Sequence, residues 1–345
     1  MRHPKVPIVL VLLAAACGPR PEGKLEGRTM GTTYHVTIVG LDEARARAVQ
    51  PRLDARLEQV NDSMSTYRPQ SELNRFNRLA RAGETFPAST DLMAVLRACA
   101  RVHELSGGAW DGTVMPLVDL WGFGPSGPVD EPPPDAAVRE RLAHVGFDRI
   151  EVRRDGLAKK DPAVTLDLSS IAKGYGVDQV AAVLRAEGLR DFVVEIGGEV
   201  YASGSRRDGR PWRVGVNRPR ADAAPDDVLE VAPLRDQAFA TSGDYRNYFE
   251  SRGVRYSHVL DPRTGRPVTT GVGSVSVRAP DCTLADGLAT AVMVMGAEAG
   301  IPLLERLEDV EGMVIVAAPD GRLVEHRTSG FRTEPREPGP GPSSR

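Results

Sequence analysis

The order of periodic segments in this chain limits its fold more than any other feature. Short alternating or β-branched segments predict strands, and longer segments with a period of 3.6 residues predict helices. The expected strands lie at residues 33–39, 164–168, 192–196, 212–216, 272–277 and 313–317. The expected helices lie at residues 41–60, 91–105, 171–187 and 283–295. Strands and helices do not alternate as strictly as in a doubly wound fold, so the sequence predicts an α+β fold.

Length and composition indicate one folded region between two flexible ends. The chain has 345 residues, 41% of them hydrophobic, which is enough for a core of ordinary size. We expect a tether over residues 17–27, a domain over residues 28–331 and a Pro/Gly/Ser-rich disordered tail over residues 332–345. The 44 Lys and Arg residues are outnumbered by 47 Asp and Glu residues, and no dense basic run occurs. This balance argues against nucleic acid as a partner.

The first sixteen residues have the features of a bacterial signal peptide. Two basic residues are followed by an apolar core at residues 8–13 and by three alanines before Cys17. About ten apolar residues are too few to span a bilayer. The small residues before Cys17 resemble a lipoprotein box, although Ala14 stands where leucine is usual. We expect export to the periplasmic side of a membrane and a lipid anchor at Cys17. Ordinary cleavage that releases a soluble product is the alternative.

Cysteine usage excludes several kinds of site. Only Cys99 and Cys282 follow Cys17, and the sequence has no CxxC pair and no Cys/His cluster. Zinc, iron–sulfur and dithiol chemistry are therefore not expected. One disulfide and two buried free thiols are both compatible with this composition.

A first candidate site is the junction between a strand-like run and the helix that follows it. Ser169 or Ser170 is expected to cap this helix, so that its first amides point outward at the positive end of the helix dipole. Lys173 adds a full positive charge, and the junction therefore suits a phosphate group. Gly174 and Gly176 indicate that something approaches the helix backbone closely, either a ligand or a neighbouring strand.

A second candidate site is a pair of oxygen ligands on the last predicted helix. Asp286 and Thr290 are four residues apart and so share one helix face. A carboxylate and a hydroxyl one turn apart suit Mg²⁺, which prefers oxygen ligands. The alternative is a polar pair on a solvated face. Small neighbours such as Ala285, Gly287 and Ala289 favour the ligand site, because they leave room beside it.

A third candidate is His258, which stands just before a turn of sequence Asp-Pro-Arg-Thr-Gly at residues 261–265. A histidine can act as a general base near pH 7. The alternative is a structural histidine that is hydrogen-bonded at the end of a strand. Asp244, Tyr245 and Arg246 are expected near the same region.

Together these segments resemble the ApbE family of FAD:protein FMN transferases, also described as flavin-binding lipoproteins. The resemblance extends from residue 29 to about residue 316 and covers nearly the whole mature chain. It rests on ordered blocks at residues 30–32, 65–67, 71–73, 108–111, 167–176, 195–199, 241–248, 256–265 and 285–290. A match of so many ordered blocks is strong, although each block alone is weak. The resemblance implies a mixed α/β fold with the active site in a cleft between two subregions.

The resemblance also implies roles for individual residues. Positions that contact FAD in the family correspond here to Met30, Tyr67, Ala109, Trp110, Asp111, Asp167, Lys173 and Val259. The Mg²⁺ ligands correspond to Ser170, whose carbonyl is a candidate ligand, and to the side chains of Asp286 and Thr290. His258 corresponds to the base that activates the acceptor hydroxyl. Trp110 departs from the family, which usually has phenylalanine there, so the contacts of its ring with FAD are expected to differ.

The reaction implied is a Mg²⁺-dependent transfer of FMN from FAD to a Ser or Thr hydroxyl of an acceptor protein, with release of AMP. An exported acceptor such as a subunit of a membrane redox complex is the expected partner. Two alternatives remain open at this point. One is a lipoprotein that only binds FAD, and the other is a Mg²⁺-dependent pyrophosphatase that splits FAD into FMN and AMP.

Overall fold

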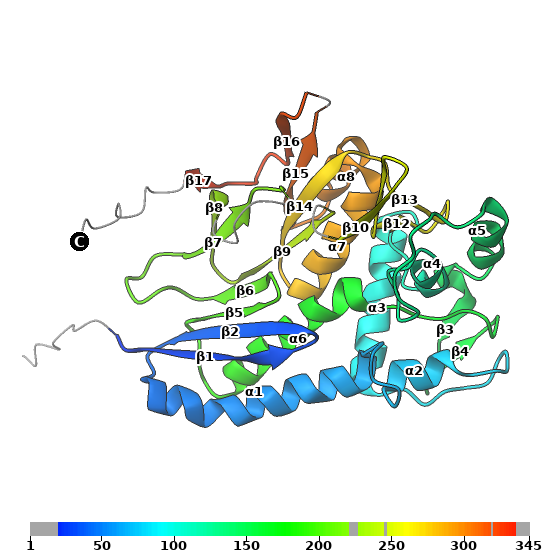
Figure 1. The fold of residues 1–345 in the computed structure, drawn as a ribbon. Coiled ribbons are helices and arrows are strands. Elements are labelled where there is room, and N and C mark those ends of the chain that lie inside the picture. Colours follow the sequence, from blue (N-terminus) through cyan, green and yellow to red (C-terminus); the bar gives the residue numbers. More distant parts are fainter. Residues whose placement is uncertain (1–19, 221–226, 245–246, 319, 336–345) are drawn as a thin grey trace, which may run out of the picture.

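An antiparallel sheet forms the centre of the molecule (Figure 1). Its strands run in the order β1 (Glu22–Thr29), β2 (Thr32–Val39), β5 (Phe192–Ile196), β6 (Glu199–Ser203), β9 (Gln237–Gly243), β14 (Val272–Ala279), β15 (Glu311–Ala317) and β16 (Leu323–Arg327). Every neighbouring pair in this sheet is antiparallel. The computed structural model describes residues 20–220, 227–244, 247–318 and 320–335, so the signal segment and Cys17 lie outside the described residues.

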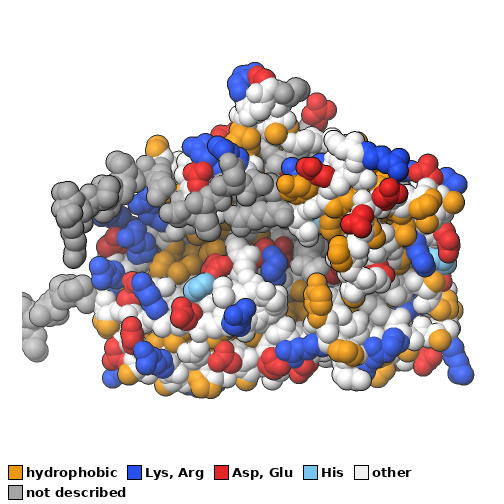
Figure 2. Space-filling view, viewed as in Figure 1, with side chains coloured by type: hydrophobic (Ala, Val, Ile, Leu, Met, Phe, Trp, Pro, Cys, Tyr) orange, Lys and Arg blue, Asp and Glu red, His pale blue; other side chains and the backbone are white. Residues whose placement is uncertain are grey.

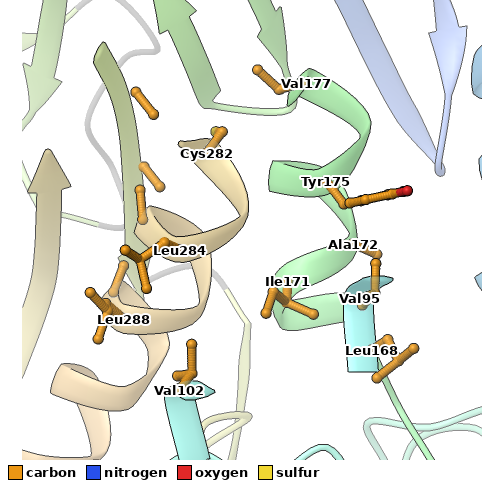
Figure 3. Packing of buried hydrophobic residues seen from close by; sticks show 14 of the residues in the cluster. Val95, Val102, Leu168, Ile171, Ala172, Tyr175, Val177, Cys282, Leu284 and Leu288 are labelled. Atoms are coloured by element: carbon orange, nitrogen blue, oxygen red, sulfur yellow. The ribbon is translucent and has the colours of Figure 1, made fainter. Parts of the chain in front are cut away.

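Several of the helices cover one face of this sheet. The α-helices of the described residues are α1 (Glu43–Met64), α2 (Glu72–Asn77), α3 (Thr90–Leu105), α4 (Met115–Leu120), α5 (Asp135–Leu142), α6 (Ser169–Ala186), α7 (Cys282–Met295) and α8 (Ala297–Glu305). Helix α7 lies on β9 and β14, and α6 lies on β5 and β6. Figure 3 shows α6 and α7 side by side, with apolar side chains of α3 such as Val95 and Val102 beside them. Burial of these side chains away from water stabilises the helix layer.

Two smaller units complete the fold. A three-stranded sheet of β7 (Trp212–Asn217), β8 (Val228–Leu234) and β17 (Glu334–Pro335) packs through its own apolar cluster against side chains of the central sheet. A lobe containing α4 and α5 also holds the hairpins β10 (Tyr248–Ser251) with β11 (Val254–Ser257) and β12 (Leu260–Asp261) with β13 (Arg266–Pro267). Leu117, Trp121, Val138 and Leu260 form the core of this lobe. The remaining hairpin pairs β3 (Ile150–Val152) with β4 (Leu157–Lys159).

The predicted α+β class is confirmed, and most predicted elements are present within a few residues of their expected ends. The strand predicted at residues 164–168 is wrong, because these residues pair with no strand. The Asn77 side chain takes the place of a strand partner. Its Oδ1 accepts the Leu166 amide at 2.8 Å, and its Nδ2 donates to the Leu166 carbonyl at 2.9 Å.

Both predicted flexible ends are shorter than expected. Residues 22–27 of the predicted tether belong to β1, where they pair with β2 along its whole length and bury Leu25. In the predicted tail, Glu334 and Pro335 form β17 and pair with β8. Composition alone favoured flexibility, but pairing with a neighbouring strand satisfies these backbone groups.

Cys99 and Cys282 are both buried free thiols, so the structure favours the second of the two possibilities left open by the sequence. Burial raises the pKa of each thiol well above its usual value. Within the described ranges, no helix combines the length and the apolar character needed to cross a bilayer.

The contact between α6 and α7 predicts the effect of two glycine substitutions. A Cβ at Gly174 would lie 2.7 Å from the Cys282 carbonyl carbon and 2.9 Å from the Asp286 Cβ, so the helices would have to separate. A Cβ at Gly287 would meet only the side-chain ends of Val102 and Ile171, at 3.0 and 3.2 Å. We expect Gly174→Ala to lower the free energy of unfolding by about 2 kcal/mol.

For Gly287→Ala we expect the free energy of unfolding to change by less than about 1 kcal/mol, because the gain in helix propensity offsets mild crowding. Denaturant unfolding of both variants measures the difference. Equal losses in the two variants would contradict a backbone-to-backbone contact at Gly174.

Candidate active site

A cavity of about 430 Å³ opens between the helix layer and the lobe that contains α4. Nearly all of the residues predicted from the sequence line it, although they come from distant parts of the chain. Those in its wall are Tyr67, Ala109, Trp110, Asp111, Asp167, Ser170, Lys173, His258, Val259, Asp286 and Thr290. The structure therefore brings the three candidate sites into one place.

Met30 lies apart from this cavity, in the wall of an adjoining one. The second cavity shares Tyr67 and Lys173 with the first, so the two lie side by side. The Met30 backbone has φ of 49°, in the left-handed region, and its side chain packs against Gly176. Tyr67 is 81% exposed where the cavities meet, and its ring is therefore free to stack on a bound aromatic group.

The two helices of the site, α6 and α7, carry the residues predicted to bind phosphate and metal. Ser170 and Lys173 lie in the first turns of α6, and Asp286 and Thr290 lie in successive turns of α7. The Asp286 side chain is buried, with 3% of the residue exposed, and its Oδ2 accepts the Gly174 amide at 3.0 Å. Burial raises the pKa of the Asp286 carboxyl, and the nearby Lys173 charge opposes that rise.

Lys173 contacts Glu199, a residue that the sequence analysis used only as part of a family block. Glu199 begins β6, is 2% exposed and bonds to the Lys173 ammonium through Oε1. Its Oε2 is buried without a hydrogen-bond partner. Burial and the Asp286 charge raise the pKa of Glu199 against the effect of Lys173. Burial alone would lower the pKa of Lys173, but Asp286 and Glu199 together raise it, so the ammonium stays charged.

The N-terminus of α6 differs from its predicted form. Neither Ser169 nor Ser170 caps the helix, which begins at Ser169 after Leu168. Asp167 supplies the hydrogen-bond acceptor at this helix end instead. Its Oδ1 accepts both the amide and the hydroxyl of Ser169, at 2.8 and 2.5 Å. Gly174 and Gly176 do mark close approaches to the backbone, but these come from α7, Met30 and β5 and not from the cavity.

Trp110 and Asp111 form another part of the cavity wall. The Trp110 indole donates to the Ser170 hydroxyl at 3.0 Å, a bond that phenylalanine at this position would lack. The Asp111 carboxylate accepts the Thr113 amide and hydroxyl and the Phe147 amide, at 2.8, 2.6 and 2.8 Å. In this structure Asp111 therefore holds the loop that presents Ala109 and Trp110.

His258 is held in one orientation at the edge of the cavity. Its Nδ1 lies 2.9 Å from the Asn247 carbonyl, and the Phe123 ring meets its face edge-on with centroids 6.2 Å apart. A carbonyl oxygen can only accept, so Nδ1 carries the proton and Nε2 keeps its lone pair. Burial lowers the pKa of His258, which keeps the ring neutral near pH 7.

Asp244 is not part of the cavity wall, although its neighbour Gly243 is. Arg255 bonds to the Asp244 backbone carbonyl at 2.5 Å and lies 3.6 Å from the Asp244 carboxylate. Tyr245 and Arg246, which were predicted for the same region, lie outside the described residues. Ser242 is an unpredicted member of the site, and its hydroxyl lies 3.2 Å from that of Thr290.

The oxygen atoms near α7 suit a Mg²⁺ ion that is shared with a bound phosphate. Among the residues with described positions, no three His, Cys, Asp or Glu side chains form a metal-binding group. Asp286 is thus the one strong charged ligand of the predicted set, and Thr290 and Ser170 contribute neutral oxygens. Mg²⁺ commonly binds through one or two carboxylates together with substrate phosphates and water, and this donor set fits that mode.

The distribution of surface charge agrees with a local phosphate site. On the face shown in Figure 2, acidic and basic side chains are interspersed among apolar ones, and the coloured residues form no broad patch of one sign. Lys173 is therefore the cation placed to bind a phosphate in this cavity. The first amides of α6 are less available than expected, because Asp167 accepts the Ser169 amide and the Leu168 carbonyl accepts those of Ile171 and Ala172.

Comparison with known proteins agrees with this geometry. Residues 30–314 match the ApbE family. The chain is 44% identical over 336 residues to the FAD:protein FMN transferase of Vibrio cholerae, which covers 96% of this chain and 98% of that protein. It is 37% identical over 341 residues to the protein of the same name from Haemophilus influenzae, again covering 96% and 98%.

Solved structures give the same result for the fold. The flavin transferase ApbE from Vibrio cholerae has a TM-score of 0.83 at 43% identity and covers 91% of this chain and 99% of its own. The apo flavinyl transferase ApbE from Pseudomonas stutzeri has a TM-score of 0.80 at 36% identity, with 90% and 95% covered. The resemblance drawn from the sequence blocks is confirmed along nearly the whole length of these relatives: the chain belongs to the ApbE family.

Proposed function

We propose that this protein transfers the FMN part of FAD to a serine or threonine hydroxyl of an acceptor protein and releases AMP. The observation that carries the proposal is the meeting of a base, a cation and oxygen ligands in one cavity. His258, Lys173 and Asp286 all line it, although they come from separate parts of the fold. The names of the curated relatives support the same activity.

His258 acts as the general base. Its Nδ1 proton is directed at the Asn247 carbonyl, which leaves the Nε2 lone pair to take the proton of the acceptor hydroxyl. The acceptor oxygen then forms a bond to the FMN-side phosphorus of FAD. The bond between that phosphorus and the oxygen bridging to the AMP phosphorus breaks, and AMP leaves with the electron pair.

Lys173 holds the diphosphate during this step. The lysine remains charged because Asp286 and Glu199 flank it. Ser170, Asp286 and Thr290 would hold the Mg²⁺ ion, which when bound neutralises charge on the diphosphate. Positioning and electrostatic stabilisation supply most of the acceleration in reactions of this kind.

We further propose that the protein is exported and carries a lipid at Cys17. The basic, apolar and small-residue segments before Cys17 support this. The acceptor would then lie outside the cytoplasmic membrane, on the same side as the anchored enzyme.

Transfer is tested by incubating the purified protein with FAD, Mg²⁺ and an acceptor that carries a Ser/Thr flavinylation motif. We expect AMP release and covalent flavin fluorescence on the acceptor in equal amounts. An acceptor with the target hydroxyl replaced by alanine is the control and should gain no flavin. Release of FMN and AMP without transfer would indicate a pyrophosphatase. FAD binding without AMP release, across several acceptors, would indicate a binding lipoprotein.

Asp286→Ala should abolish Mg²⁺-dependent turnover, with a loss of about 100-fold or more, because it removes the charged ligand. FAD should still bind weakly through the aromatic and Lys173 contacts. Single-turnover kinetics over a Mg²⁺ titration and FAD fluorescence measure the two effects separately. The exposed Glu298 on α8 offers a control, and Glu298→Ala should behave as the wild type does.

His258→Ala should lower the rate about 100-fold or more and change FAD affinity little, because a general base acts on the acceptor. Since burial lowers the pKa of His258, the base is neutral at pH 7 and becomes protonated only as the pH falls below its usual pKa of about 6.5. The wild-type kcat/KM should therefore decline on the acid side of pH 6.5.

The variant should lack this decline, and the control His326→Ala on β16 should retain it. Normal turnover by His258→Ala would rule out its role as the base.

A further inference from the structure

The two helices of the site are joined by a pair of carboxylates that point in opposite directions. Asp178 on α6 reaches to the start of α7, where it accepts the Cys282 amide at 2.8 Å and the Thr283 amide and hydroxyl at 2.9 and 2.5 Å. Asp286 on α7 reaches back to the Gly174 amide of α6 at 3.0 Å. Each helix thus supplies an acceptor for the backbone of the other.

Helix geometry explains why the pair is reciprocal. The helices meet at Gly174 and Cys282, where a Cβ on the glycine would collide with the cysteine backbone. Asp178 follows Gly174 by four residues, and Asp286 follows Cys282 by four. Each carboxylate therefore lies about one turn beyond the contact point on its own helix. A shift of one helix along the other would break both sets of hydrogen bonds.

Asp178 is not needed as the ordinary cap of α7. That role belongs to Asp281, whose Oδ1 accepts the Leu284 amide at 2.8 Å from within the same chain segment. Asp178 instead takes the amides of the first two helical residues, which no intrahelical acceptor can satisfy. It lies outside the active-site cavity, in a separate depression that also contains Asp281 and Thr283.

We propose that Asp178 is a positioning residue that fixes the register of α7 against α6. This register sets how far Asp286 and Thr290 lie from Ser170 and Lys173, and so prepares the site for Mg²⁺ and the diphosphate. The inference rests on the proposed transferase function for its kinetic consequence. Its structural consequence, a coupling between the start of α7 and the Gly174 amide, does not depend on that function.

Asp178→Asn tests the proposal, because an amide keeps the size of the side chain but turns one of its acceptors into a donor. We expect kcat/KM to fall by about 10- to 100-fold and the Mg²⁺ concentration for half-maximal rate to rise, since small misplacements of reacting groups are costly. FAD affinity measured without Mg²⁺ should change less than 3-fold, because the substitution removes no direct contact with FAD. Asp281→Asn is the matched control, because asparagine still caps α7 and should leave both values within about 2-fold.

Hydrogen exchange of the protein without FAD or Mg²⁺ gives the second measurement. In Asp178→Asn the amide of Gly174 should exchange about 10-fold faster or more, although it lies one turn from the substitution, whereas Asp281→Asn should leave it unchanged. Thr283→Val is a milder variant that removes only the hydroxyl bond to Asp178, and it keeps the test available if Asp178→Asn does not fold. Thr283→Val should raise the exchange rate of the Gly174 amide, lower kcat/KM and raise the Mg²⁺ requirement, each by a smaller factor than Asp178→Asn does.

Three results would overturn the proposal. The first is unchanged exchange at Gly174 in both Asp178→Asn and Thr283→Val. The second is an equal effect of Asp178→Asn and Asp281→Asn on the Mg²⁺ requirement. The third is a lower thermal stability of Asp178→Asn with wild-type kcat/KM, which would mean a structural role only. If the wild type transfers no FMN, the proposed function fails, but the exchange experiment still decides whether Asp178 couples the helices.

Discussion

The close approach of α6 and α7 is the interaction on which the rest of the site depends. It requires glycine at position 174, because the Cys282 backbone occupies the space that a Cβ would need. The contact places Lys173, one residue before the glycine, near Asp286, one turn after the cysteine. Both helices also pack on the central sheet, so only the face of each helix that is turned away from the sheet and from its partner can line the cavity. The proposed phosphate site on α6 and the oxygen pair on α7 become a single candidate site through this contact.

Charge balance in the cavity supports the proposed Mg²⁺ ion. One lysine lies among two buried carboxyls, Asp286 and Glu199, and the low-polarity surroundings raise the pKa of both. Lys173 is held in its charged form by these neighbours and cannot by itself neutralise a diphosphate. A divalent cation beside Asp286 would supply the missing positive charge. This reasoning supports the proposed Mg²⁺ dependence independently of the relatives' names.

The lobe built around α4 contributes His258, the proposed base, and part of the cavity wall. The backbone carbonyl of Asn247 and the ring of Phe123 fix the orientation of His258. The direction of its Nε2 lone pair is therefore determined by a backbone group and a packed ring, and not by a carboxylate. Trp110, which packs in the main core, contacts α6 through its bond to the Ser170 hydroxyl. A phenylalanine at this position would lack that bond. Tryptophan therefore adds one constraint on the Ser170 hydroxyl.

Periodicity and short motifs are local properties, and they were enough to predict the α+β class, the main helices, the family and a set of site residues of which nearly all line one cavity. The sequence by itself did not reveal Glu199 beside Lys173 or Asp178 beneath Cys282, since these pairs are far apart in the chain and only folding brings them together. Local rules also failed at residues 164–168, where a side-chain amide from Asn77 replaces a strand, and at the start of α6, where Asp167 satisfies the backbone in place of the predicted serines. Tertiary structure decided these points, because a buried hydrogen-bonding group takes whatever partner the fold places beside it.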